Sequence, residues 1–204
     1  MQQRGLTLIE MAVTLAVMAL LLFAAAPNIG AWIDNTRIRN AADSLQSGLQ
    51  LARGEAVRRN QSVTFWLVSS DDPAKLDNSC ALSNTSGSWV VSLLSPAGNC
   101  GVSDPTEAPM IVTSRPVGDG GGSVAVTAVQ SDGTTAATQI TFNGFGRIAN
   151  TTDAINKIDV TGTHDGVEYR YLRLEVSSAG LVRMCDPRVT NATDPRLCKL
   201  SNAE

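Results

Sequence analysis

Apolar and polar positions divide the chain into two parts with different periods. Residues 6–33 hold one charged side chain, Glu10, and this apolar run is long enough to cross a bilayer, which takes about 20 residues. After Pro27 the pattern becomes amphipathic, with apolar side chains at steps of three and four residues: Ile38, Ala42, Leu45, Leu49, Ala52 and Ala56. We predict one helix over residues 6–59, kinked or loosened at Pro27, whose second half buries its apolar stripe against a partner layer.

From Ser62 onward the apolar side chains recur with a period of two, which is typical of half-buried strands. Turn-forming runs at residues 71–73, 95–99 and 118–122 separate the alternating segments. The strands expected from this pattern are 62–68, 89–94, 110–115, 124–129, 139–142, 154–160, 168–176 and 181–184. The expected fold class is therefore α+β, with a β-rich head covering one face of the long helix.

Composition narrows the classes of function. The chain has 204 residues, 43% of them hydrophobic, and a net charge of −3. Apolar content of this size with a small net charge argues against disorder, and the acidic balance argues against a strongly basic nucleic-acid binder. The sequence contains no P-loop, nucleophile elbow, zinc helix or paired-carboxylate signature, so we expect no catalytic residue, no cofactor and no enzymatic activity.

Four cysteines indicate disulfides rather than a metal site. Cys80, Cys100, Cys185 and Cys198 form no C-x-x-C pair, and the one histidine, His164, is far from all of them in the sequence. The spacing favours pairs of Cys80 with Cys100 and Cys185 with Cys198, although four cysteines allow three connectivities and the sequence does not choose among them. Disulfides imply an oxidising compartment, such as the periplasm or the cell exterior.

Three interpretations of the N-terminal run compete. A secretory signal peptide would be cut after residues 24–26, but Glu10 would then interrupt its apolar core and Pro27 would follow the cut. An ordinary membrane anchor would leave the Glu10 carboxylate unpaired at a cost of several kcal/mol. The third interpretation explains this carboxylate, because residues 4–10 resemble the cleavage signature of type IV prepilins and type II secretion pseudopilins: Arg-Gly-Leu-Thr-Leu-Ile-Glu.

The resemblance assigns roles to four positions. In that family a dedicated peptidase cleaves after the glycine, here Gly5, and the new N-terminal residue, here Leu6, is N-methylated; most members have Phe at this place. Glu10 and Pro27 also stand at family positions and are the expected subunit-docking residues. The resemblance implies that Glu10 pairs with the N-terminal amine of a neighbouring subunit in the fibre core, where loss of one partner costs several kcal/mol.

The same resemblance implies the organisation and the location of the chain. We expect a leader peptide at residues 1–5, a transmembrane and fibre-core helix half at 6–29, an amphipathic helix half at 30–60 and a periplasmic β-rich head at 61–204. Arg4 stays on the cytoplasmic side by the positive-inside rule, which places the head in the periplasm and agrees with the cysteines. The implied location is the bacterial inner membrane, in a single pass, and afterwards a pilus or pseudopilus fibre.

A second segment points to a subfamily. Residues 51–60, Leu-Ala-Arg-Gly-Glu-Ala-Val-Arg-Arg-Asn, resemble the segment that marks H-type pseudopilins of type II secretion and FimT/FimU-type minor pilins, in which Ser usually replaces Gly54. Residues 140–147 correspond to a strand-plus-turn motif of that subfamily. The implied fold is pilin-like, with the helix packed on an antiparallel sheet, and the implied function is to initiate or cap a fibre. Implied partners are other minor pilins or pseudopilins, the major subunit, the prepilin peptidase and the inner-membrane assembly platform.

The alternative function is that of a DNA-binding minor pilin that acts as a DNA receptor in natural transformation. Residues 170–204 hold six basic and four acidic side chains, whereas the rest of the chain has an excess of acids. Some FimT-type proteins bind DNA through a Gly-Arg-x-Arg motif, and in the corresponding residues 180–183 only the second arginine is present. The candidate contacts are Arg183, Arg188, Arg196 and Lys199, and binding through them would be directed at phosphates and sensitive to salt. The competing interpretation is a solvated structural loop.

Overall fold

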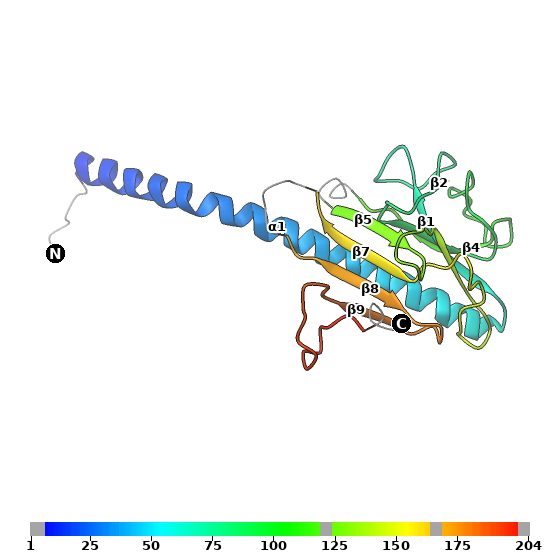
Figure 1. The fold of residues 1–204 in the computed structure, drawn as a ribbon. Coiled ribbons are helices and arrows are strands. Elements are labelled where there is room, and N and C mark those ends of the chain that lie inside the picture. Colours follow the sequence, from blue (N-terminus) through cyan, green and yellow to red (C-terminus); the bar gives the residue numbers. More distant parts are fainter. Residues whose placement is uncertain (1–6, 119–123, 164–168, 200–204) are drawn as a thin grey trace, which may run out of the picture.

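The computed structural model describes residues 7–118, 124–163 and 169–199, with only the backbone of residues 24–29. The expected processing residues Gly5 and Leu6, His164 and most of the glycine run at 118–122 lie outside these ranges. One long helix projects from a head of two sheets, and the sheets pack against one face of the C-terminal half of that helix (Figure 1). This arrangement confirms the expected α+β class.

The helix α1 runs from Leu8 to Arg59 and is continuous through Pro27. Thr7 caps its first turn, because the Thr7 hydroxyl accepts a hydrogen bond from the backbone N–H of Glu10 at 3.3 Å. The helix ends at Asn60, which adopts a left-handed conformation with φ 51° and directs its N–H back to the last turn. The predicted extent of the helix is thus confirmed within two residues.

The first sheet is antiparallel, and in the described part of the chain it holds five strands: β1 (Val63–Ser69), β2 (Ala81–Leu82), β3 (Ser88–Ser92), β4 (Ile111–Arg115) and β6 (Gln139–Phe142). β1 pairs with β3 along one edge, and β3 pairs in turn with β4. The other edge of β1 is shared, since β6 pairs with its first half and β2 with its last two residues. Four of these strands were predicted, and the two-residue β2 was not.

The second sheet is also antiparallel, and its four described strands lie in the order β5 (Val124–Val129), β7 (Lys157–Gly162), β8 (Leu172–Val176) and β9 (Val182–Cys185). All four were predicted. β7 begins three residues later than the sequence pattern suggested, because Ile155 and Asn156 belong to a connection that bonds to β6 and β5. The predicted strand at 168–176 begins outside the described residues, and its described part forms β8 from Leu172.

One apolar core lies between α1 and both sheets. The six stripe residues predicted from the helical period, Ile38 to Ala56, are all fully buried, and they contact side chains of both sheets. Gly48 lies on the same face, where a Cβ would come within 2.8 Å of the Phe65 ring and 2.9 Å of the Trp89 ring. The missing side chain therefore lets the first sheet approach the helix. Among the described residues, buried apolar side chains begin at Ile38, so the head has a core independent of the N-terminal half of α1.

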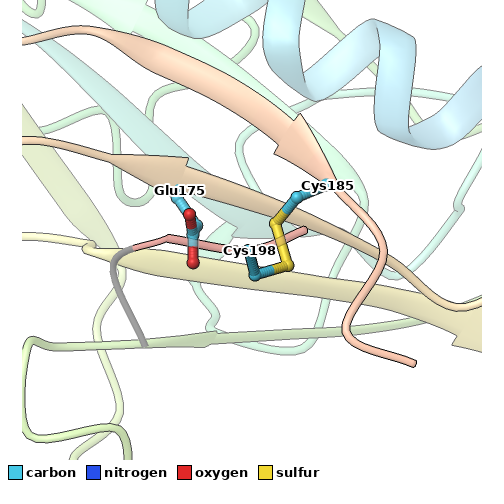
Figure 2. Close-up of side chains that lie close together, drawn as sticks. All are labelled: Glu175, Cys185 and Cys198. Atoms are coloured by element: carbon cyan, nitrogen blue, oxygen red, sulfur yellow. A yellow bond between two sulfur atoms is a disulfide. The ribbon is translucent and has the colours of Figure 1, made fainter. Parts of the chain in front are cut away.

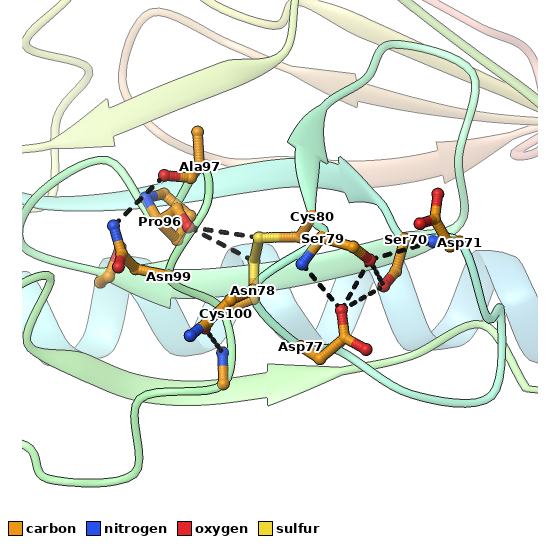
Figure 3. The surroundings of a disulfide bond; sticks show 12 residues. Ser70, Asp71, Asp77, Asn78, Ser79, Cys80, Pro96, Ala97, Asn99 and Cys100 are labelled. Carbon is orange, nitrogen blue, oxygen red and sulfur yellow. Dashed lines mark hydrogen bonds between the residues drawn. A yellow bond between two sulfur atoms is a disulfide. The ribbon is translucent and has the colours of Figure 1, made fainter.

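A third layer covers the outer face of the first sheet. The disulfide between Cys80 and Cys100 closes a loop over this face (Figure 3). It packs on the buried side chains of Trp66, Val68 and Val90. β1 is therefore buried on both faces. In the same loop the Asp77 carboxylate accepts hydrogen bonds from the hydroxyl and the N–H of Ser79, at 2.6 and 2.8 Å, which lowers the pKa of Asp77.

Candidate assembly surfaces

The N-terminal half of α1 exposes its apolar side chains. Large apolar residues from Leu8 to Phe23 are at least half exposed, and Leu8 and Phe23 reach 89% and 87%. No described layer of the head covers residues 8–23 of the helix (Figure 1). The side chain of Glu10 is exposed on the same segment and forms no ion pair with any residue that the structure describes. Within the described residues this apolar segment has no partner in its own fold, and a large exposed apolar surface of this kind is typical of an assembly surface.

Within the described residues, no helix carries an apolar stretch sufficient in length to cross a membrane. The docking roles expected for Glu10 and Pro27, and processing at Gly5 and Leu6, stay predictions.

Three motifs that are distant in the sequence meet at the other end of α1. The Nε of Arg53, in the subfamily segment of the helix, donates a hydrogen bond of 2.9 Å to the carbonyl of Gly146, in the turn after β6. Gly180, in the turn between β8 and β9, lies so close that a Cβ there would be 2.1 Å from the Gly146 oxygen. Both glycines have positive φ, +72° and +78°. Arg53 therefore fastens the helix to the turn after β6, and the turn between β8 and β9 packs against that turn.

Sequence reasoning treated these three motifs separately. It assigned the segment at 51–60 to a helix end and the segment at 140–147 to a strand and turn, but it did not bring Arg53, Gly146 and Gly180 together. The sequence offered one signal for this contact: Gly146 and Gly180 both stand in turns, and glycine permits two backbones to approach closely. Beside this contact lies a groove of about 450 Å³ lined by Gln50, Arg53, Gly54, Val57, Gly180, Leu181 and Val182.

The end of α1 also carries a group of charges. Arg58 and Arg59 both donate hydrogen bonds to the Glu55 carboxylate, at 2.6 and 2.8 Å, and these bonds lower the pKa of Glu55 to about 2. Both arginines lie in the last turn of α1, where basic side chains also interact favourably with the helix dipole. Phe145 and Leu181 stand beside this end with exposed fractions of 85% and 60%, so apolar surface accompanies the charges.

A second disulfide fastens the C-terminal segment across β8 and β9. Cys185, the last residue of β9, bonds to Cys198 beside the buried Glu175 carboxylate (Figure 2). The backbone N–H of Lys199 donates a hydrogen bond of 3.1 Å to that carboxylate. The ligand atoms of Glu175, Cys185 and Cys198 lie within 4.8 Å of one another, but both sulfurs are occupied by the disulfide. Both cysteine pairs are those that the spacing favoured. We call residues 186–199 the C-terminal strap.

The candidate DNA contacts have different surroundings. The Nη2 of Arg183 donates to the carbonyls of Pro195 and Leu197, at 2.6 and 2.8 Å, so this guanidinium braces the strap. Arg196 forms an ion pair of 2.8 Å with Asp194. Arg188 and Lys199 are exposed. The structure thus gives Arg183 a structural role, and DNA binding through these four residues stays a prediction.

Comparisons with known proteins fit this arrangement. The family described as "Type II transport protein GspH" matches residues 41–180, and the "Prokaryotic N-terminal methylation motif" matches residues 1–26. A search of curated protein sequences gave no significant match.

Among solved structures, the chain is similar to two crystal forms of the type IV minor pilin FimU of Pseudomonas aeruginosa strain PAO1. One shows 16% identity and a TM-score of 0.44 and covers 72% of this chain and 90% of that chain. The other shows 15% identity and a TM-score of 0.47 and covers 75% of this chain and 91% of that chain.

The long helix with its uncovered apolar half and the two sheets define a pilin-like structural protein. The chain belongs to the GspH family, whose match covers most of its length, and it carries the N-terminal methylation motif. The resemblance to type IV minor pilins and pseudopilins that residues 4–10 and 51–60 indicated is thereby confirmed. Proteins of this kind act together with other pilins or pseudopilins in a fibre.

Proposed function

We propose that the chain is a minor subunit that helps to initiate or cap a type IV pilus or a type II secretion pseudopilus. The observation that carries the proposal is the apolar half of α1, which projects from the head and bears one carboxylate, Glu10. In the membrane this half serves as an anchor, and in the fibre it packs among the equivalent helices of other subunits. A buried carboxylate there requires a cationic partner.

Processing supplies that partner. The prepilin peptidase cleaves after Gly5, and the Leu6 amine that is exposed and methylated is a cation at the start of the helix. The other subunits of the fibre carry a cationic amine at the same place. Glu10 of this chain pairs with the amine of its neighbour and so fixes the axial register of docking. Before assembly the head lies in the periplasm, where the two disulfides form, and the inner-membrane platform then moves the subunit into the fibre.

Mass spectrometry of sheared surface fibres, with the inner-membrane fraction analysed in parallel, tests this proposal. Peptides that begin at methylated Leu6 in the sheared fraction indicate a subunit of a type IV pilus. The same peptides in the membrane fraction only indicate a short secretion pseudopilus. A chain with residues 1–5 intact in both fractions contradicts the proposal. A Gly5→Ala variant is the matched control, since it should remain unprocessed.

A further inference from the structure

One tryptophan of the chain is exposed, and it stands at the end of the apolar run. Trp66 and Trp89 are buried in the head, with exposed fractions of 9% and 5%, whereas Trp32 is 68% exposed. Asp34, two residues later, is the first charged residue after Glu10. The indole of Trp32 thus lies where the helix passes from apolar to polar sequence. Tryptophan is enriched at this level of membrane proteins, because its ring is apolar and its N–H is polar.

Trp32 belongs to a stripe of α1 that continues into the head. Trp32, Asn35 and Arg39 follow one another at steps of three and four residues and so share one face of the helix. The side-chain oxygen of Asn35 accepts a hydrogen bond of 2.8 Å from the backbone N–H of Arg170, which precedes β8. This contact holds Arg170 beside the helix. We call Trp32, Asn35, Arg39 and Arg170 the neck stripe.

The neck stripe carries positive charge that can reach a phosphate. Arg39 and Arg170 are both exposed and line one cavity of about 370 Å³. Arg39 has a loose ion pair with Asp43 at 3.7 Å, in which both side chains are more than half exposed. Arg170 forms no ion pair within the described ranges. Side chains of a helix lean toward its N-terminus, so the stem of Arg39 leads back toward Trp32.

The same cavity also holds opposing charges. Asp186 and Arg196 line it as well, and Arg196 pairs with Asp194. The available cations are therefore Arg39 and Arg170, on the side of the cavity nearest Trp32.

The length of the helix matches the thickness of a bilayer at this position. Leu8 and Trp32 are 24 residues apart, which is about 36 Å of helix at 1.5 Å per residue. A bilayer has a hydrocarbon core of about 30 Å and a full thickness of about 40–45 Å. When Leu8 lies at one interface, Trp32 lies at the other. Arg39 is then about 10 Å farther along the helix, within reach of the phosphates for a long side chain that extends backward.

We propose that the neck stripe binds the phospholipid headgroup layer on the periplasmic face of the membrane and so fixes the depth at which the subunit waits before assembly. The occupant of this surface is the headgroup layer, with the Trp32 indole at the level of the glycerol and carbonyl groups and the two arginines on the phosphates. This inference rests on the proposed membrane anchoring of α1 and adds a position and a set of contacts to it.

Fluorescence quenching in vesicles tests the proposed depth. The full-length chain is reconstituted into vesicles of phosphatidylcholine and phosphatidylglycerol in which a fraction of the lipid carries bromine, either near the headgroup or near the chain end. A Trp32→Phe variant supplies the signal of the buried tryptophans, which is subtracted. Shallow bromines should quench Trp32 more strongly than deep bromines, because the indole lies at the interface.

A second variant separates this inference from the anchoring on which it rests. Phe23→Trp in the Trp32→Phe background places the reporter nine residues deeper along α1. Deep bromines should quench this reporter more strongly than shallow ones. If the Phe23→Trp reporter is quenched and Trp32 is not, or if Trp32 is quenched mainly by deep bromines, the proposed headgroup binding of the neck stripe is wrong. The proposed membrane anchoring is then retained. If neither reporter is quenched, both proposals fail.

A separate pair of variants tests the contribution of Arg39 and Arg170. Replacement of Arg39 and Arg170 by Gln should lower the ratio of shallow to deep quenching of Trp32 by about twofold, since the helix loses its hold on the phosphates. Replacement of Arg58 and Arg147 by Gln removes the same charge at the far end of the head and should leave the ratio unchanged. An equal effect of both pairs would show that net charge, and not the neck stripe, sets the depth.

Discussion

Two glycines of α1 differ in what a methyl group would meet. A Cβ at Gly48 would lie 2.8 Å from Phe65 and 2.9 Å from Trp89, whereas a Cβ at Gly54 would have no neighbour within 4 Å. We expect Gly48→Ala to destabilise the head by about 1–3 kcal/mol through overpacking, which exceeds the gain in helix propensity. Gly54→Ala should stabilise it by up to about 1 kcal/mol, because alanine favours a helix over glycine.

Urea unfolding of a fragment that begins at Gly30 measures both changes, and each variant is the control of the other. A Gly48→Ala variant at least as stable as wild type would contradict the packing of Phe65 and Trp89 against the helix.

Glu55 gives the head a local dependence on pH. Hydrogen bonds from Arg58 and Arg59 lower its pKa from 4.5 to about 2, so the folded state favours the carboxylate. The stabilisation is complete above the unfolded pKa and is lost as the pH falls through the folded value. Glu55→Gln should therefore lower the free energy of unfolding near neutral pH by less than about 1 kcal/mol, the size of two helical ion pairs. The difference from wild type should shrink as the pH falls from 4.5 toward 2.

Urea midpoints of both proteins along this pH range measure the effect. A difference that stays constant at all pH values would mean that the Glu55 carboxylate contributes nothing as a charge.

At the scale of elements, the C-terminal strap depends on the guanidinium of Arg183. Its bonds to the carbonyls of Pro195 and Leu197 are charge-assisted, a type worth about 1.5–3 kcal/mol each. In Arg183→Gln we expect the amides of residues 186–199 to exchange hydrogen at least about tenfold faster, while the disulfide still tethers the strap. Exchange in the buried part of α1 should not change.

Arg188→Gln is the matched control, since the Arg188 side chain is exposed. Equal hydrogen exchange in both variants would show that Arg183 does not brace the C-terminal strap. A loss of DNA retention by Arg183→Gln without faster exchange would instead favour the DNA-binding interpretation.

The elements were predictable wherever their signal is local. The stripe from Ile38 to Ala56 follows from the helical period, and eight strands follow from alternation between turns. β2 was missed because its two residues become a strand only through pairing with the end of β1. The contact of Arg53 with Gly146 was missed for a related reason, because it joins residues 93 positions apart. No periodicity in the sequence reports a contact of that kind.

At the scale of the whole molecule, the chain separates a folded head from an assembly helix. The buried apolar side chains of the described residues begin at Ile38, and the exposed apolar residues of α1 are concentrated before it. The sequence predicted this division from the single charge in residues 6–33. The sequence did not predict the hydrogen bond between Asn35 and Arg170, which attaches the head to this part of α1, because that contact depends on the fold. Stability and assembly should therefore respond to different mutations.

Glu10 tests this separation most directly. Glu10→Gln keeps the shape of the side chain and removes the charge that the proposed pairing with a neighbouring amine requires. We expect the amount of the chain in sheared fibres or in the cross-linked pseudopilus to fall at least about tenfold, because breaking a buried ion pair costs about 3–5 kcal/mol. The urea midpoint of the head should not change, because no described residue near Glu10 belongs to its core.

Thr14→Ala, one helical turn away, is the control for a change on the same segment, since its hydroxyl only bonds to the Met11 carbonyl within α1. It should enter the assembly at the wild-type level. Incorporation of Glu10→Gln at the wild-type level would show that the carboxylate does not set docking. A lower urea midpoint in Glu10→Gln would show that the assembly helix and the head are coupled, against the division that the burial pattern indicates.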